Sequence, residues 1–143
     1  MGCNVAHATA DIGTRDYEVA LRAGGHPLTA DEGIRAGGQD RGPTPHELLC
    51  AALAACTAIT LRMYAQRKAW PLPSLHVDVR LELQGPERTI TRTLQLGGNL
   101  DEAQRARLAD IAERTPVTLT LKQGVKITTV LAAPGAEGVA AAS

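Results

Sequence analysis

The sequence is poor in aromatic side chains and carries no net charge. Its 143 residues include one Trp, two Tyr and no Phe, and 15 Lys and Arg balance 15 Asp and Glu. A hydrophobic core must therefore be aliphatic and rich in alanine. No electrostatic footprint for nucleic acid or for a membrane surface is present, so neither is expected as a partner. The length suits one domain, and 44% apolar residues suffice for a single core.

Motifs for metals, cofactors and disulfide frameworks are also missing. No CxxC or HxxxH occurs, the four histidines lie far apart, and Gly97-Gly98 lacks the second half of a dinucleotide fingerprint. We therefore expect no metal and no cofactor. The N-terminal residues contain no apolar segment of the signal-peptide kind, and three cysteines, an odd number, predict reduced thiols. Both observations favour a cytoplasmic location.

The strongest helix signal lies within residues 42–67. Thr44-Pro45-His46-Glu47 fits a capping box: the Thr44 hydroxyl accepts the N–H of Glu47, the Glu47 carboxylate accepts the N–H of Thr44, and Pro45 takes the first helical position. Residues 48–61 contain no charge, Gly or Pro, so every face of the helix is apolar. We expect this helix to be buried all round, with a second subunit as a favoured neighbour. We also expect it to be too short to span a bilayer, which needs about 20 apolar residues.

Alternating segments and turns on both sides of this helix predict an α+β fold. A small N-terminal β-meander is expected over residues 4–10, 17–22 and 26–30, with a turn at Gly24-Gly25 and a loop over 31–42. Residues 75–84 and 88–96 alternate apolar and polar side chains and predict a hairpin, whose second strand turns Ile90, Leu94 and Leu96 inward.

The C-terminal third predicts two helices and a strand. Asn99 with Glu102 offers a capping signature for an amphipathic helix over roughly 100–114. The arginines between Arg88 and Arg114, accompanied by acids, are interpreted as solvated. Thr115-Pro116 starts a short helix that stops at Gly124. The β-branched segment 125–131 predicts a last strand, and residues 132–143 predict a frayed tail.

Cysteine is the residue type that could carry chemistry. A Cys in an Ala- and Leu-rich helix is usually a small buried hydrophobe, and reactivity requires a cation nearby. Cys50 and Cys56 are separated by about 9 Å along a helix axis and by about 120° around it, so they do not form an internal redox pair. Cys3 could reach either one only if the first strand passes the helix.

The stretch GPTPHELLCAALAACTAITLRMYAQRKAWPLP, with the meander before it, the hairpin after it and the RTPVTLTL segment, resembles the OsmC/Ohr family of osmotically induced and organic hydroperoxide resistance proteins. The resemblance implies a single OsmC-like domain over residues 1–131. It implies an intertwined homodimer with the central helices buried together and two active sites at the interface. Peroxidases of this family reduce organic hydroperoxides, as part of the oxidative stress response, with a reactive Cys in this helix, a resolving Cys before a proline, and an Arg and a Glu that hold the thiolate.

Carried over onto this chain, the resemblance assigns the reactive Cys to Cys56 and the Arg to Arg15, with Arg41 as a weaker substitute. Arg15 could equally be an exposed turn charge. Two positions depart from the family pattern. Thr115 stands at the resolving Cys position, so the usual intramolecular disulfide cannot form. The family's Glu position holds His46, and Glu47 next to it is better explained as the capping partner.

Three hypotheses follow from these residues. The first is a thiol-dependent peroxidase in which Cys56 is oxidised by an organic hydroperoxide and restored by an external thiol reductant. The second is a dimeric, non-redox module that binds a small apolar or lipid-like ligand. A third uses Cys56 as an acyl-transfer nucleophile, although no His base is evident.

Overall fold

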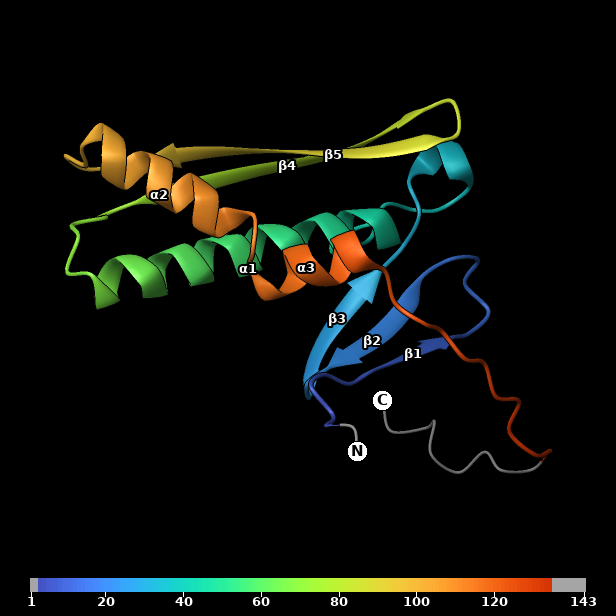
Figure 1. Ribbon diagram of the computed structural model, residues 1–143. Coiled ribbons are helices and arrows are strands. Elements are labelled where there is room, and N and C mark those ends of the chain that lie inside the picture. The colour runs from blue at the N-terminus through green and yellow to red at the C-terminus, as the bar shows by residue number, and fades with distance from the viewer. Residues whose placement is uncertain (1–2, 135–143) are drawn as a thin grey trace. The chain divides into compact units, whose positions relative to one another are not determined.

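The computed structural model describes residues 3–134 (Figure 1). The chain divides into two compact units, which are described separately. The first contains the described residues 3–48 and 128–134, and the second is Leu49–Ile127. Three α-helices and two antiparallel sheets make up these units, which confirms the predicted α+β class. Of the predicted tail, residues 135–143 lie outside the described part of the chain.

The first unit is built on a three-stranded antiparallel meander. Strands β1 (Ala8–Ile12), β2 (Val19–Ala23) and β3 (His26–Ala30) pair in chain order. Gly24 and Gly25 both have positive φ, 57° and 86°, as a tight two-residue hairpin turn requires. The predicted meander and turn are confirmed, but the first strand lies further along the chain than the predicted segment 4–10.

A loop with one short 3-10 turn, η1 (Ile34–Ala36), follows the meander. Gly42 lies so close to the end of β3 that a Cβ there would collide with the carbonyl oxygen of Thr29. The close approach places Pro43 beside Asp31, whose N–H donates to the Pro43 carbonyl at 3.2 Å. The loop thus returns to the sheet just before the long helix begins.

Helix α1 (Pro45–Arg67) starts where the sequence predicts. The Thr44 N–H donates to Oε1 of Glu47 at 2.9 Å, and the Glu47 N–H donates to Oγ1 of Thr44 at 3.2 Å. Both arms of the predicted capping box are therefore present. After Arg67 the helix stops at a turn in which Ala69 takes a positive φ of 57°, directly before Trp70 and Pro71.

The single chain buries only one stripe of α1, so it does not by itself provide the expected burial on all faces. The stripe consists of Leu53, Thr57, Leu61 and Ala65, spaced four residues apart. Elsewhere on the helix Ile59 and Met63 are 55% and 57% exposed.

The expectation that α1 is too short to cross a bilayer is also wrong. The helix has 23 residues and is long and apolar enough by length and composition. Core helices pass the same test, so this is weak evidence of a membrane span.

Strands β4 (Leu75–Gln84) and β5 (Glu87–Leu96) form the predicted hairpin. Their register pairs Leu75 with Leu96 and Leu83 with Arg88. Alternation along both strands places the apolar residues of β4 on the same face as Ile90, Leu94 and Leu96 of β5, as predicted.

Helix α2 (Glu102–Ala112) completes the core of the second unit, in which Leu61, Leu108 and Ala112 are at most 2% exposed. Its N-cap is Asp101, whose side chain accepts the Gln104 N–H at 2.8 Å. The predicted cap at Asn99 is therefore wrong by two residues, because Asp101 with Gln104 also supplies both arms of a capping box.

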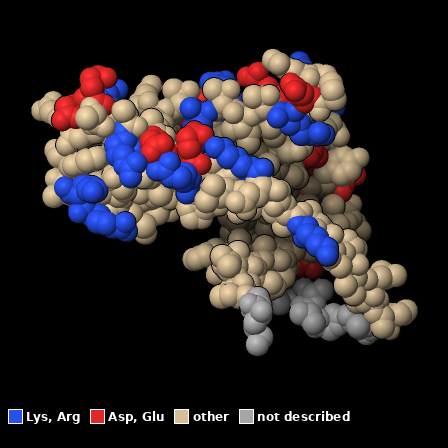
Figure 2. All heavy atoms as spheres, viewed as in Figure 1, with Lys and Arg blue, Asp and Glu red and all other residues tan. Residues whose placement is uncertain are grey.

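Helix α2 carries both acids and bases, and basic and acidic side chains are intermixed on the face drawn in Figure 2. Asp110 lies between Arg107 and Arg114, at 2.9 and 2.8 Å. The hydrogen bond from Arg114 is the main reason that the pKa of Asp110 lies below its usual value, despite an opposing effect of burial.

Helix α3 (Pro116–Gln123) starts at the predicted cap, Thr115, and ends at Gly124. Residues 125–131, predicted as a strand, form no ladder in the chain, so that prediction is wrong for the chain by itself. A β-branched segment becomes a strand only when a sheet edge supplies its backbone partners. Val125 and Ile127 are instead 65% and 85% exposed.

Candidate functional site: a cysteine facing a helix N-terminus

Cys56 lies on α1 next to the buried stripe and is half-buried. Its Sγ accepts the backbone N–H of Val117 at 3.4 Å and lies 4.0 Å from the hydroxyl oxygen of Thr60. Val117 belongs to the first turn of α3, where the backbone N–H groups have no partner within the helix. The thiol therefore faces a backbone donor at the N-terminus of a helix.

The position of α3 beside Cys56 is set by a buried polar network centred on Arg92 of β5. The Arg92 side chain is 10% exposed. Its Nη1 donates to the hydroxyls of Thr57 at 3.0 Å and Thr118 at 2.8 Å, and its Nη2 lies 3.3 Å from Oε2 of Glu113. Thr57 follows Cys56 on α1, and Thr118 follows Val117 on α3. The Arg92 guanidinium thus hydrogen-bonds to both helical turns that form the thiol contact, one on α1 and one on α3.

The hydroxyls in this network are buried and fully used. Thr57 is 0% exposed and donates to the Leu53 carbonyl at 2.7 Å. Thr118 is 4% exposed and lies 2.6 Å from the hydroxyl of the cap residue Thr115. Within the described residues, no buried side-chain nitrogen or oxygen lacks a hydrogen-bond partner. The network is therefore satisfied and rigid.

Glu113 links the network to solvent. Its carboxylate accepts from Lys122 at 2.7 Å as well as from Arg92. The hydrogen bond from Lys122 is the largest influence on this carboxyl, and together with the Arg92 charge it outweighs burial and lowers the pKa of Glu113.

Sequence reasoning missed Arg92, and the interpretation of this region's arginines as solvated is wrong for it. The sequence did contain a signal that Arg92 is buried. Arg92 lies midway between Ile90 and Leu94 in a strand whose alternate residues face inward. A charge in an inward register needs a buried partner. Two threonines elsewhere in the sequence, Thr57 and Thr118, supply the hydroxyls that accept from Arg92, and nothing in their local sequence identifies them as a pair.

Two other predicted site residues serve helix caps. Glu47 accepts the Thr44 N–H, as described above, and Thr115 caps α3 by accepting the Thr118 N–H at 3.2 Å. His46 is exposed in the first turn of α1. Cys3 is exposed, Cys50 is half-buried, and all three cysteines are free.

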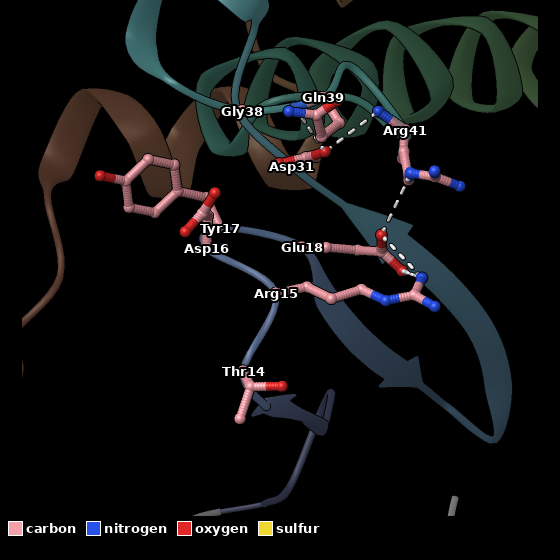
Figure 3. Close-up of a pocket in the computed structure, with 9 residues that line it drawn as sticks. All are labelled: Thr14, Arg15, Asp16, Tyr17, Glu18, Asp31, Gly38, Gln39 and Arg41. Atoms are coloured by element: carbon pink, nitrogen blue, oxygen red, sulfur yellow. Dashed lines mark hydrogen bonds and ion pairs between the residues drawn. The ribbon is translucent and has the colours of Figure 1, made fainter.

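Arg15 and Arg41 belong to the first unit, where they share one carboxylate (Figure 3). Nη1 of Arg15 and Nε of Arg41 each lie 3.5 Å from Oε1 of Glu18. Both side chains are solvent-exposed, by 73% for Arg15 and 59% for Arg41. They border a cavity of about 280 Å³ between the β1–β2 connection and the loop that precedes α1.

Asp31 organises this loop from beneath. The side chain is buried and accepts the Glu32 N–H at 2.7 Å. It also accepts the N–H groups of Gln39 and Arg41, both at 3.1 Å (Figure 3). Burial opposes the ionised carboxylate, but the three backbone donors outweigh it, so the pKa of Asp31 lies below its usual value. The backbone of Arg41 is thereby held in place. Among residues 3–134, no group of three His, Cys, Asp or Glu side chains could hold a metal ion.

Fold and site together define a class of protein. In this class, an α+β chain presents a half-buried cysteine of a long apolar helix to the N-terminus of a short helix. The sequence matches the family model described as OsmC-like protein over residues 37–130. The chain therefore belongs to the OsmC-like protein family. No curated protein matches the chain.

Solved structures share the fold. An OsmC-like protein from Mycoplasma pneumoniae has 20% identity and a TM-score of 0.72, with 83% of this chain and 88% of that one covered. An organic hydroperoxide resistance protein OsmC from Legionella pneumophila has 19% identity and a TM-score of 0.63, with coverage of 85% and 92%. An organic hydroperoxide resistance protein from Elizabethkingia anophelis has 14% identity and a TM-score of 0.58, with coverage of 83% and 89%.

Proposed function

We propose that this protein is a thiol-dependent peroxidase that reduces organic hydroperoxides through Cys56. The observation that carries the proposal is the contact of the Cys56 sulfur with the N–H of Val117 at the start of α3. A nucleophilic cysteine must react as the thiolate, and helix N-termini favour that form. Membership in the OsmC-like family and the fold shared with hydroperoxide resistance proteins support the same chemistry.

The reaction would proceed in three balanced steps. The thiolate attacks the terminal oxygen of the hydroperoxide, the O–O bond breaks, and the alkoxide takes up a proton and leaves as an alcohol. Cys56, oxidised by two electrons, becomes a sulfenic acid. An external thiol condenses with the sulfenic acid to form a mixed disulfide and water. A second external thiol then attacks the mixed disulfide, which frees the Cys56 thiol and leaves the two external thiols joined as a disulfide.

An external reductant is part of the proposal because no second cysteine occupies the resolving position. Thr115 stands there and caps α3. Cys50 lies six residues before Cys56 on the same helix, beyond disulfide reach. Arg15, with Arg41 as the weaker substitute, remains the proposed cation for the leaving oxygen.

The decisive experiment follows the loss of cumene hydroperoxide in the presence of a small dithiol. Wild-type protein should consume peroxide catalytically, Cys56→Ser should not, and Cys50→Ser should behave as wild type. Dimedone should label Cys56 after one equivalent of peroxide. Equal peroxide loss by wild type and Cys56→Ser, or labelling of Cys50 instead, would contradict the proposal.

Roles for the other predicted residues can be separated in the same assay. Arg15→Met should lower the rate of peroxide reduction more than Arg41→Met does. If Glu47 acts only as a cap, Glu47→Gln, which keeps an oxygen acceptor, should retain activity. His46→Gln tests whether the histidine replaces the family's carboxylate.

We also propose that the working form is a homodimer. Leu49, Ile59 and Met63 leave apolar area of α1 exposed, which a second copy could cover. The unpaired segment 125–131 could add to a sheet edge of that copy. Light scattering at micromolar concentration should give twice the chain mass, and Ile59→Asp should shift it toward the monomer. A monomeric wild type would contradict this.

A further inference from the structure

A cavity of about 370 Å³ lies in the second unit between β5, α3 and α1. Its volume is within the range of small-molecule sites. Neither Cys56 nor Val117 lines it. Thr118 and Val117 are consecutive residues that face different sites. The Thr118 hydroxyl accepts from Arg92 in the cavity wall, whereas the Val117 N–H donates to the thiol sulfur. The cavity therefore lies next to the thiol site, and neither residue of the thiol contact lines it.

Three cations and one carboxylate line the cavity. Arg88 and Arg92 are placed on the same side of β5 by its two-residue period, and Lys122 comes from the end of α3. Glu113 is the single acid, and it is shared by Arg92 and Lys122 at 3.3 and 2.7 Å. Within residues 3–134, no carboxylate lies within 4.0 Å of Arg88. The lining thus carries two positive charges in excess.

The rest of the lining is largely aliphatic. Leu53 of α1 is 4% exposed, and Ile90 of β5 and Leu121 of α3 are half-buried. Apolar walls weaken the screening of nearby charges and offer a surface for an alkyl chain. A cationic rim beside an aliphatic wall is complementary to an anion that carries a short apolar chain. A highly charged ligand would leave that wall without a partner.

We propose that this cavity binds a small aliphatic carboxylate as a ligand rather than as a peroxide substrate. The carboxylate lies between Arg88 and Lys122, and the chain packs on Leu53, Ile90 and Leu121. Arg92 and Glu113 form the floor and keep their mutual contact. The site does not depend on Cys56, so it stands or falls independently of the proposed peroxidase activity.

Isothermal titration calorimetry with octanoate tests the site. We expect saturable binding of one octanoate per chain, weakened by salt because exposed charges contribute. Octan-1-ol, which lacks the charge, should bind at least about tenfold more weakly, because the hydrogen bonds from charged groups to the carboxylate are lost. Acetate, which lacks the chain, should also bind at least about tenfold more weakly, because it leaves the aliphatic wall uncovered. Octyl phosphate tests whether a different anionic headgroup is accepted; tighter binding than octanoate would overturn the assignment of a carboxylate ligand.

Matched variants locate the binding. Arg88→Gln should weaken octanoate about tenfold, whereas Arg80→Gln, an exposed arginine on the neighbouring strand β4 outside the lining, should leave it unchanged. Ile90→Trp should abolish binding by filling the cavity, with circular dichroism as the check on folding. Cys56→Ser should bind octanoate as wild type does. Absence of saturable binding, equal effects of the two arginine variants, or octan-1-ol binding as tight as that of octanoate would overturn the proposal.

Discussion

Replacing Arg92 with methionine tests whether the buried network holds α3 against Cys56. The substitution keeps an unbranched apolar stem and removes the guanidinium. Two donations to buried threonine hydroxyls are lost, at 3.0 and 2.8 Å. Hydrogen bonds from a charged donor are worth about 1.5–3 kcal/mol, and the released hydroxyls keep their own carbonyl acceptors. The ion pair with Glu113 adds little, because that side chain is 59% exposed.

The net cost should be about 2 kcal/mol, since the methionine also avoids the desolvation of a guanidinium. Arg88→Met is the matched control: it lies on the same face of β5, is exposed and lacks a hydrogen bond to the network, so it should change stability by less than about 0.5 kcal/mol.

Urea denaturation at one protein concentration measures both variants, and a 2 kcal/mol loss corresponds to a midpoint shift of about 1 M. If the two variants have free energies of unfolding within about 0.5 kcal/mol of each other, Arg92 does not hold the network and does not position α3.

Three further changes probe the elements around the candidate sites. Thr115→Ala removes the α3 cap and should lower the free energy of unfolding by about 1–2 kcal/mol in urea denaturation, whereas Thr115→Ser should lose much less. Asp31→Asn should lower the melting temperature at pH 7. Because the folded pKa of Asp31 is depressed, the stability that its carboxylate contributes is present above the unfolded pKa of about 3.9 and fades as the pH falls below that value. The difference in melting temperature between variant and wild type should therefore be smaller near pH 3. Gly42→Ala forces a collision with the carbonyl of Thr29 and should lower the melting temperature more than Gly13→Ala, where a Cβ meets nothing within 4 Å.

Local chemistry explains why much of the fold could be predicted. The start of α1 depends on Thr44 and Glu47, three residues apart, and the start of α3 depends on Thr115 and Pro116, so neighbouring residues contain the information. The hairpin follows from two-residue alternation over 75–84 and 87–96. The same reasoning assigned a strand to 125–131, where β-branched residues are present and the chain supplies no ladder.

The sequence by itself determined where α1 and α3 begin, which strands form the hairpin and that Cys56 lies on an apolar helix. Only the tertiary structure decided which backbone group meets its sulfur, because Val117 is 61 residues further along the chain. It likewise decided that Arg92 is buried, since the hydroxyls that solvate its charge come from α1 and α3, 35 and 26 residues away. Propensity and capping act between near neighbours, whereas the environment of a thiol or a buried charge is set by residues that only folding brings together.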